Sequence, residues 1–284
     1  MKKGLIMEGG AMRGMFTAGV TDVMMENGIT FDGAIGVSAG AVFGINYKSN
    51  QPGRVIRYNT AYCRDKRYCS IRSLIFTGDL YGNRFCYHEL PNRLDLFDTE
   101  TYAASPMEFY AVVTDVDTGE AVYRRCDRWE EDEIEWLRAS ASMPLASRII
   151  EIEEGGRRFR LLDGGVADSI PIRAFEKMGY DRNVVILTQP LGYIKEKSSA
   201  LPLIRFAYRK HPRFIEALAR RHEMYNETIE YLTRREKEGA VYVIRPSRKL
   251  PVNHVEKDPM KLRECYDIGR KCCNVEEIRA FLGE

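Results

Sequence analysis

A serine at the centre of a G-x-S-x-G pentapeptide is the residue in this chain whose setting most favours nucleophilic chemistry. Ser38 lies in the pentapeptide 36–40, between an apolar stretch (31–37) that predicts a short buried strand and a small-residue stretch (39–45) that predicts a helix. A strand, a sharp turn and a helix form a nucleophile elbow, and its glycines avoid side-chain clashes in the turn. The pentapeptide alone is a weak signal, so other segments have to support it.

A glycine-rich turn near the N-terminus is the first of these segments. Residues 8–14 read Glu-Gly-Gly-Ala-Met-Arg-Gly, between an apolar run (5–7) that predicts the first strand and a helical pattern that ends at Asn27-Gly28. Such a turn directs several backbone N–H groups into one concavity, where they bind a phosphate or the oxyanion of a tetrahedral intermediate. An ordinary connection in an α/β fold also fits. The spacing matches neither a Walker A loop nor a full dinucleotide-binding pattern.

The second supporting segment is Leu161-Leu162-Asp163-Gly164-Gly165. Residues 157–162 predict a strand that returns from a turn, so Asp163 follows at its end in a glycine-rich loop. At such a position the carboxylate either projects into a cleft or caps a turn, and the sequence alone allows both.

In this order, the three segments resemble the patatin-like phospholipase family of lipid acyl hydrolases. The resemblance covers about the first 190 residues, and the segment Ala139–Pro144 also resembles an alanine/serine-rich stretch of the family. It implies a three-layer α/β/α sandwich with a mostly parallel central sheet. It further implies a phospholipid or lysophospholipid ester as substrate, and we expect no cofactor and no metal.

The resemblance also assigns roles to individual residues. Ser38 matches the nucleophile and Asp163 the aspartate of a Ser–Asp dyad. In that role Asp163 takes the proton of the serine hydroxyl and later protonates the leaving alcohol. Residues that match the oxyanion and substrate-binding positions are Gly9, Gly10, Ala11, Arg13, Gly14 and Ala39. The family loop often has a third consecutive glycine where this chain has Ala11.

Two alternatives stay open at this point. One is a Ser–His–Asp esterase, because His211, His222 and His254 follow Asp163 in the order of an α/β-hydrolase. The early position of Ser38 argues against it, and each histidine is interpreted as a surface or capping residue. The other is a non-catalytic lipid- or anion-binding protein that keeps the loops.

The rest of the chain predicts one domain over residues 1–284. The family motifs fall within 4–190, and 191–284 is expected to be a helical extension packed on the same core. Strands are predicted at 109–114, 121–124, 183–188 and 241–244, and helices at 129–141, 214–232 and within 265–282.

Composition indicates a globular protein, with 44% hydrophobic and 30% charged residues and a net charge of +2. No run reaches the ~18 apolar residues of a membrane span, and the N-terminus does not read as a signal peptide. The seven cysteines contain no C-x-x-C pair, which favours reduced thiols and a cytoplasmic location.

A basic aromatic segment, residues 54–72, carries the clearest local charge. Its arginines and lysine alternate with Tyr58, Tyr62 and Tyr68. Such a segment either contacts an anionic membrane surface or forms a solvated helix face. Nothing resembles a nucleic-acid recognition motif, and the oligomeric state is left open.

Overall fold

The computed structural model describes residues 1–283, and one eight-stranded sheet organises them. The order of its strands is β5-β6-β3-β2-β1-β7-β8, and β4 pairs with β3 off this path. The strands are β1 (Lys2–Met7), β2 (Gly33–Val37), β3 (Glu108–Asp115), β4 (Ala121–Arg125), β5 (Ile150–Glu154), β6 (Arg157–Asp163), β7 (Tyr180–Ile186) and β8 (Val241–Ile244).

The centre of the sheet is parallel. Strand β1 pairs in parallel with β2 and β7, β2 with β3, and β7 with β8. Strands β4, β5 and β6 pair in the antiparallel sense at one side. The predicted α/β architecture with a mostly parallel central sheet is confirmed.

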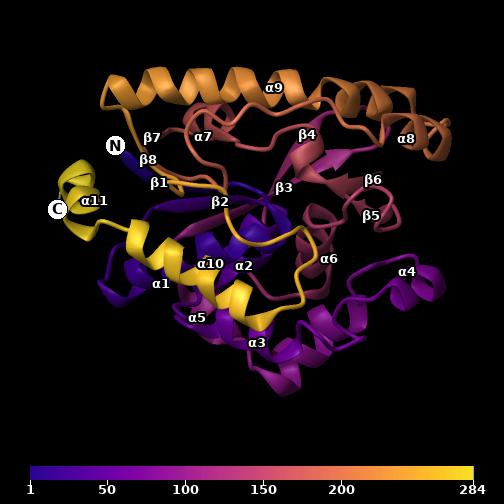
Figure 1. Cartoon of the computed structure of the whole chain (residues 1–284), viewed down its shortest axis with the longest axis horizontal. Coiled ribbons are helices and arrows are strands. Elements are labelled where there is room, and N and C mark those ends of the chain that lie inside the picture. Colours follow the sequence, from indigo (N-terminus) through magenta and orange to yellow (C-terminus); the bar gives the residue numbers. More distant parts are fainter. Residues whose placement is uncertain (284) are drawn as a thin grey trace.

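Helices cover both faces of this sheet (Figure 1). The long helix α9 lies with α7 on one face, and α1, α2 and α10 lie on the other. The helices are α1 (Gly14–Glu26), α2 (Ala39–Lys48), α3 (Arg54–Tyr62), α4 (Ile71–Thr77), α5 (Thr99–Ala104), α6 (Glu131–Ser140), α7 (Ile172–Lys177), α8 (Leu201–Ala207), α9 (Pro212–Lys237), α10 (Pro259–Cys272) and α11 (Val275–Leu282). Two short 3₁₀ helices are η1 (Ala11–Arg13) and η3 (Gly164–Val166), and η2 (Arg84–Leu94) is a π-helix.

Two main cores follow from the alternation of side chains along the central strands. On β1, Leu5 and Met7 pack into the core beneath α1 and α10, whereas Ile6 packs into the core beneath α7 and α9. Phe16 of α1 belongs to the first core and Tyr225 of α9 to the second. A strand that is buried on both faces has to be apolar at every position, which explains the continuous run at 5–7.

Two strands meet end to end along one edge of β3. Val112 of β3 pairs with Val37 of β2 on one side and with β4 on the other. The next residue, Val113, pairs with Asp163 of β6 on one side and with β4 on the other. Since β4 occupies one edge of β3, β2 and β6 share the opposite edge. They run in opposite directions, so the C-terminal ends of both strands come together there.

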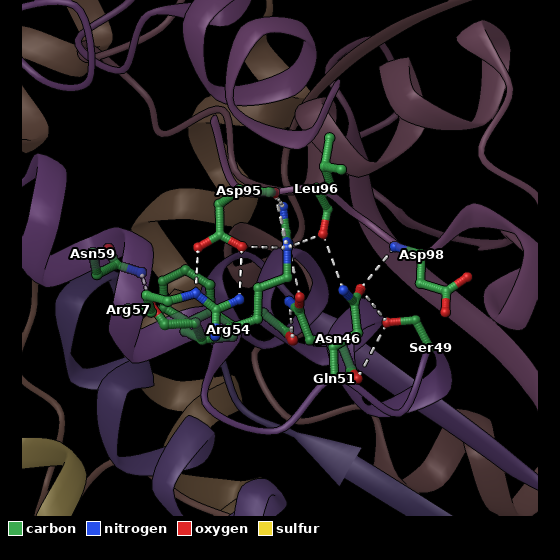
Figure 2. A network of polar contacts seen from close by, with 11 residues as sticks. Asn46, Ser49, Gln51, Arg54, Arg57, Asn59, Asp95, Leu96 and Asp98 are labelled. Carbon is green, nitrogen blue, oxygen red and sulfur yellow. Dashed lines mark hydrogen bonds and ion pairs between the residues drawn. The ribbon is translucent and has the colours of Figure 1, made fainter. Parts of the chain in front are cut away.

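Ion pairs engage three arginines of the basic aromatic segment, residues 54–72. Arg54 and Arg57 both pair with Asp95, at 3.4 and 2.7 Å, and Figure 2 shows the two guanidinium groups around that carboxylate. Arg67 pairs with Asp65 and Glu89. Tyr58 and Tyr68 are buried in the core. Internal ion pairs therefore use much of the charge that the sequence concentrates here.

The predicted strands and helices of the second half are also present. The strand predicted at 183–188 is β7, which lies between β1 and β8. The strand predicted at 241–244 is β8, so the segment after residue 190 contributes to the central sheet. Within residues 1–283, no helix combines the length and the hydropathy needed to cross a membrane.

Candidate active site

Ser38 lies at a sharp turn between β2 and α2. Its backbone has φ 54° and ψ −120°, a left-handed conformation that is unfavourable for a residue with a side chain. A Cβ atom at Gly36 would lie 2.4 Å from the Gly40 carbonyl oxygen, and one at Gly40 would lie 2.3 Å from the Met7 carbonyl oxygen. The two glycines are therefore required by close backbone approach, and the geometry is that of a nucleophile elbow.

A buried serine of α6 holds this turn in place. The Ser38 N–H donates to the Ser140 hydroxyl at 3.0 Å, and that hydroxyl donates to the Val112 carbonyl at 2.6 Å. Ser140 is fully buried at the C-terminal end of α6. The relay connects the elbow to β3, so part of the stretch at 139–144 has a structural role.

Asp163 ends β6 beside Ser38, and its backbone is fixed at both polar atoms. The N–H donates to the Ser142 carbonyl, and the carbonyl accepts from the Thr114 hydroxyl, each at 2.8 Å. One carboxylate oxygen accepts from the Gly165 N–H at 2.8 Å. The other groups that act on the carboxylate are the Ser38 hydroxyl and the Arg221 guanidinium.

Burial raises the pKa of the Asp163 carboxyl above its usual value. Hydrogen bonding by the Ser38 hydroxyl, the positive charge of Arg221 and the Gly165 N–H lower this pKa in part. A carboxylate with a raised pKa is a better proton acceptor than a solvated one, which suits a group beside a hydroxyl nucleophile.

The glycine-rich loop lies directly against Ser38. A Cβ atom at Gly9 would be 3.1 Å from the Ser38 Cβ. Within residues 1–283, the N–H groups of Gly9, Gly10, Ala11 and Ala39 donate to no protein acceptor. Ala11 has φ 48°, the conformation that glycine adopts freely. The chain thus keeps a glycine-like backbone at the position where it departs from the family pattern, at some cost in strain.

The Glu8 carboxylate stabilises the start of this loop, a role that the sequence did not indicate. Its carboxylate is buried and accepts hydrogen bonds from the Thr188 N–H at 2.5 Å, the Thr188 hydroxyl at 3.1 Å and the Tyr225 hydroxyl at 2.9 Å. The ends of β1 and β7 and the middle of α9 are joined in this way. Gly14 packs against Ala39 and Phe43, so it supports the helices rather than the cavity.

Ser38 lies where two cavities of different character meet. One is lined mainly by apolar and aromatic side chains of α2, α3, η2 and α6, among them Val42, Tyr58 and Leu90. The other is polar and contains Asp163 together with the glycine-rich loop. Ala11, Ser38 and Met143 line both cavities.

Two histidines lie closer to the site than the sequence indicated. His222, which is half-buried, and His254, which is exposed, both line the polar cavity, a position that the sequence did not indicate. All four histidines fall within residues 1–283, and in that range none hydrogen-bonds to Ser38 or Asp163. His222 faces Glu223 at 3.9 Å, His254 faces Arg13 at 3.4 Å, and His211 faces Asp117 at 3.5 Å.

The polar cavity also contains charged side chains that carried no sequence signal. Arg13 was expected near the loop, and it lies there with its Nε 3.4 Å from the Thr188 hydroxyl. Lys195 and Arg221 join it from the segment after β7 and from α9. Neither belongs to a recognisable motif, and only the tertiary fold brings them to the site.

A family model described as "Patatin-like phospholipase" matches residues 5–176, more than half of the chain. The chain belongs to the patatin-like phospholipase family. A second model, a domain of unknown function termed DUF6363, matches residues 211–283. The patatin-like phospholipase family acts on lipid substrates, which agrees with an apolar cavity that opens at Ser38.

One curated relative and one solved structure extend the comparison. The "Uncharacterized protein YjjU" of Escherichia coli (strain K12) is 26% identical over 281 residues, which cover 94% of this chain and 75% of that protein. The crystal structure of VipD from Legionella pneumophila aligns with a TM-score of 0.45 and 14% identity, over 99% of this chain and 67% of that chain.

The backbone conformation of Ser38 leads to a prediction about stability. Ser38→Gly should be more stable than Ser38→Ala by about 1 kcal/mol, because relief of roughly 1–3 kcal/mol of strain exceeds the entropic cost of glycine. Denaturant unfolding of the two variants measures the difference, and both lack the hydroxyl. A glycine variant less stable than the alanine variant would show that the turn stores no strain.

The second prediction separates Asp163 from the histidines of the same cavity. Asp163→Asn should lower the rate of ester hydrolysis at least ~10²-fold, because the amide cannot accept a proton. His222→Gln and His254→Gln are the matched controls and should keep most of the activity. The wild-type rate should fall at acid pH, as the carboxyl whose pKa is raised by burial takes up a proton. A histidine variant as inactive as Asp163→Asn, with unchanged stability, would replace the dyad by a triad.

Proposed function

We propose that the protein is a serine acyl hydrolase that cleaves carboxylic esters of phospholipids or lysophospholipids. Ser38 is the proposed nucleophile and Asp163 the proposed acid–base partner. The observation that carries this proposal is the position of Ser38, at an elbow beside a buried carboxylate and between an apolar and a polar cavity. An ester with a long acyl chain and a polar leaving group fits this division.

In the proposed reaction Asp163 accepts the Ser38 proton as the hydroxyl attacks the ester carbonyl. The free N–H groups of the glycine-rich loop and of Ala39 stabilise the oxyanion that forms. Protonated Asp163 then donates its proton to the leaving alcohol. Water attacks the acyl-enzyme by the same sequence and releases the fatty acid and Ser38.

The apolar cavity is the proposed site for the acyl chain. Burial of each methylene contributes ~0.8 kcal/mol, so an apolar lining favours long chains over short ones. Val42 lies one turn after Ser38 on α2 and lines this cavity. The basic aromatic segment, residues 54–72, contributes the buried side chains of Tyr58 and Tyr68 to the lining of this cavity.

The proposed contact with an anionic membrane is better supported at α8 and at α4, which overlaps the end of segment 54–72, than at the rest of that segment. Exposed apolar side chains lie on both helices, at Ile75 and Phe76 of α4 and Phe206 of α8. The residues that follow the two helices contact residues 143–148, because the Leu80 N–H donates to the Ala146 carbonyl and the Leu145 N–H donates to the Tyr208 hydroxyl. Figure 1 shows α4 and α8 at the same end of the molecule.

Basic side chains accompany these apolar residues. The Arg72 guanidinium lies 5.7 Å from the ring centroid of Phe76, and that of Arg209 lies 5.5 Å from the ring centroid of Phe206. Apolar side chains flanked by cations are typical of surfaces that bind anionic lipid. Of residues 143–148, Met143 lines both cavities and Pro144 and Leu145 line the polar one, so a lipid bound at this surface would lie beside the cavities that contain Ser38.

An alkyl fluorophosphonate probe tests the proposed function. The wild-type protein should be labelled at Ser38, as located by mass mapping, and a long-chain probe should react faster than a short-chain one. Val42→Trp should reduce this preference by about tenfold, since the indole displaces two or more methylenes. Val23→Trp on α1, outside both cavities, is the control.

Absence of labelling at Ser38 would refute the hydrolase proposal. A folded, unlabelled protein that still bound lipid would instead fit a non-catalytic lipid-binding role.

A vesicle experiment tests the membrane surface. The double variant Phe76→Glu/Phe206→Glu should bind anionic vesicles at least about tenfold more weakly, because two exposed rings lose their burial in lipid. Met260→Glu, at an exposed apolar residue of α10, is the matched control. Sedimentation measures the binding, and the ratio of activity on vesicles to activity on a soluble ester should fall in parallel. Equal binding by the double variant and the control would exclude this surface.

A further inference from the structure

Three cations converge on the polar cavity from distant parts of the sequence. Arg13 comes from η1, Lys195 from the segment after β7, and Arg221 from α9. Within the described residues 1–283, none of the three forms an ion pair with a carboxylate. Elsewhere in the chain half-exposed arginines do so; Arg235, for example, pairs with Glu176 at 3.2 Å.

Each cation is held in place by contacts with groups other than carboxylates. Arg13 approaches the Thr188 hydroxyl and the His254 ring, each at 3.4 Å. Arg221 donates to the Gly165 carbonyl at 2.5 Å. The Lys195 ammonium lies 4.4 Å from the ring centroid of Tyr225. Such contacts orient the three cationic groups. Because a partly buried charge is poorly solvated, each cation favours an anionic partner.

The ionisation of the neighbouring groups indicates the same crowding of positive charge. The pKa of Lys195 is lowered to about 8, mainly by burial and also by the charges of Arg221 and Arg13, while Glu8 acts in the opposite direction. Burial, Arg13, Lys195 and Arg221 also lower the pKa of His254. A bound anion would reverse these repulsions.

Within residues 1–283, the carboxylates of this cavity form no direct ion pair with the three cations. Glu8 is already engaged by Thr188 and Tyr225. Asp163 is engaged by the Gly165 N–H and the Ser38 hydroxyl. Glu196 is exposed at the rim.

We propose that Arg13, Lys195 and Arg221 form a binding site for the phosphate of the substrate's leaving group. The inference rests on the proposed hydrolase function, because the apolar cavity then takes the acyl chain and the polar one takes the alcohol. Arginine and lysine donors match phosphate oxygens in charge and geometry, and three of them suit a phosphate with a charge near −2.

This site gives a role to the part of the chain beyond the family match. Lys195, Arg221 and His254 all lie outside residues 5–176, and the last two lie in the matched domain of unknown function at 211–283. Arg221 and Tyr225 of helix α9 line the same polar cavity as Ser38. The C-terminal segment therefore builds the leaving-group side of the site.

Binding of sn-glycerol 3-phosphate to the Ser38→Ala protein tests the site without turnover. Calorimetry should detect binding of glycerol 3-phosphate, no binding of glycerol, and at least about tenfold weaker binding of inorganic phosphate. Lys195→Gln should weaken the binding of glycerol 3-phosphate by about 10- to 100-fold, since one charge-assisted contact is lost. Lys195→Arg should restore most of it. Lys197→Gln, at an exposed lysine outside the cavity, is the control.

Two results would overturn the proposal. One is binding of glycerol 3-phosphate that Lys195→Gln leaves unchanged; the other is inorganic phosphate that binds as tightly as glycerol 3-phosphate. In the active protein, Lys195→Gln should lower the ratio of kcat/KM for a 1-acylglycerol 3-phosphate to that for the matching monoacylglycerol. If the protein hydrolysed no ester but still bound glycerol 3-phosphate in a Lys195-dependent way, the hydrolase proposal would be refuted and the phosphate site would remain.

Discussion

The edge of β3 opposite β4 is the constraint on which the site depends. Strand β2 runs along it as far as Val112, and β6 approaches from the other direction as far as Val113. Because the two strands end at neighbouring positions, the residues at or just after their ends, Asp163 and Ser38, have to meet. A slip of β6 by one residue would turn the carboxylate to the other face of the sheet, so register alone decides whether the pair can form.

The local patterns of the sequence predicted the parts of the site that depend on backbone shape. Glycines at 36 and 40 indicated a tight elbow, and the structure shows that a Cβ at either position would clash with backbone atoms. The apolar run before Asp163 indicated a strand end. What these patterns could not predict is the pairing of two strands more than 100 residues apart. The resemblance to a family supplied that information, because no local rule relates residue 38 to residue 163.

The charged residues show the limit of the sequence most clearly. The basic residues of segment 54–72 are close together in sequence, yet Asp95 and Glu89, which lie outside the segment, form ion pairs with three of its arginines. Lys195 and Arg221 stand in unremarkable stretches, yet folding brings both into the polar cavity, where neither forms a direct ion pair with a carboxylate of residues 1–283. Local charge density therefore says little about electrostatic potential at a site, because the compensating groups come from anywhere in the chain.

The different character of the two cavities has a consequence for how an ester would be oriented. Apolar burial is non-directional and grows with each methylene, so the apolar cavity favours long chains without fixing which carbonyl meets Ser38. A charged group has a preferred position, set by the donors that contact it. On the proposed function, the cations at 13, 195 and 221 would therefore hold the leaving group at a set distance from the elbow. The choice of ester bond would depend on that distance, whereas the preference for acyl-chain length would depend on the lining of the apolar cavity. Different parts of the polypeptide would therefore control the two properties.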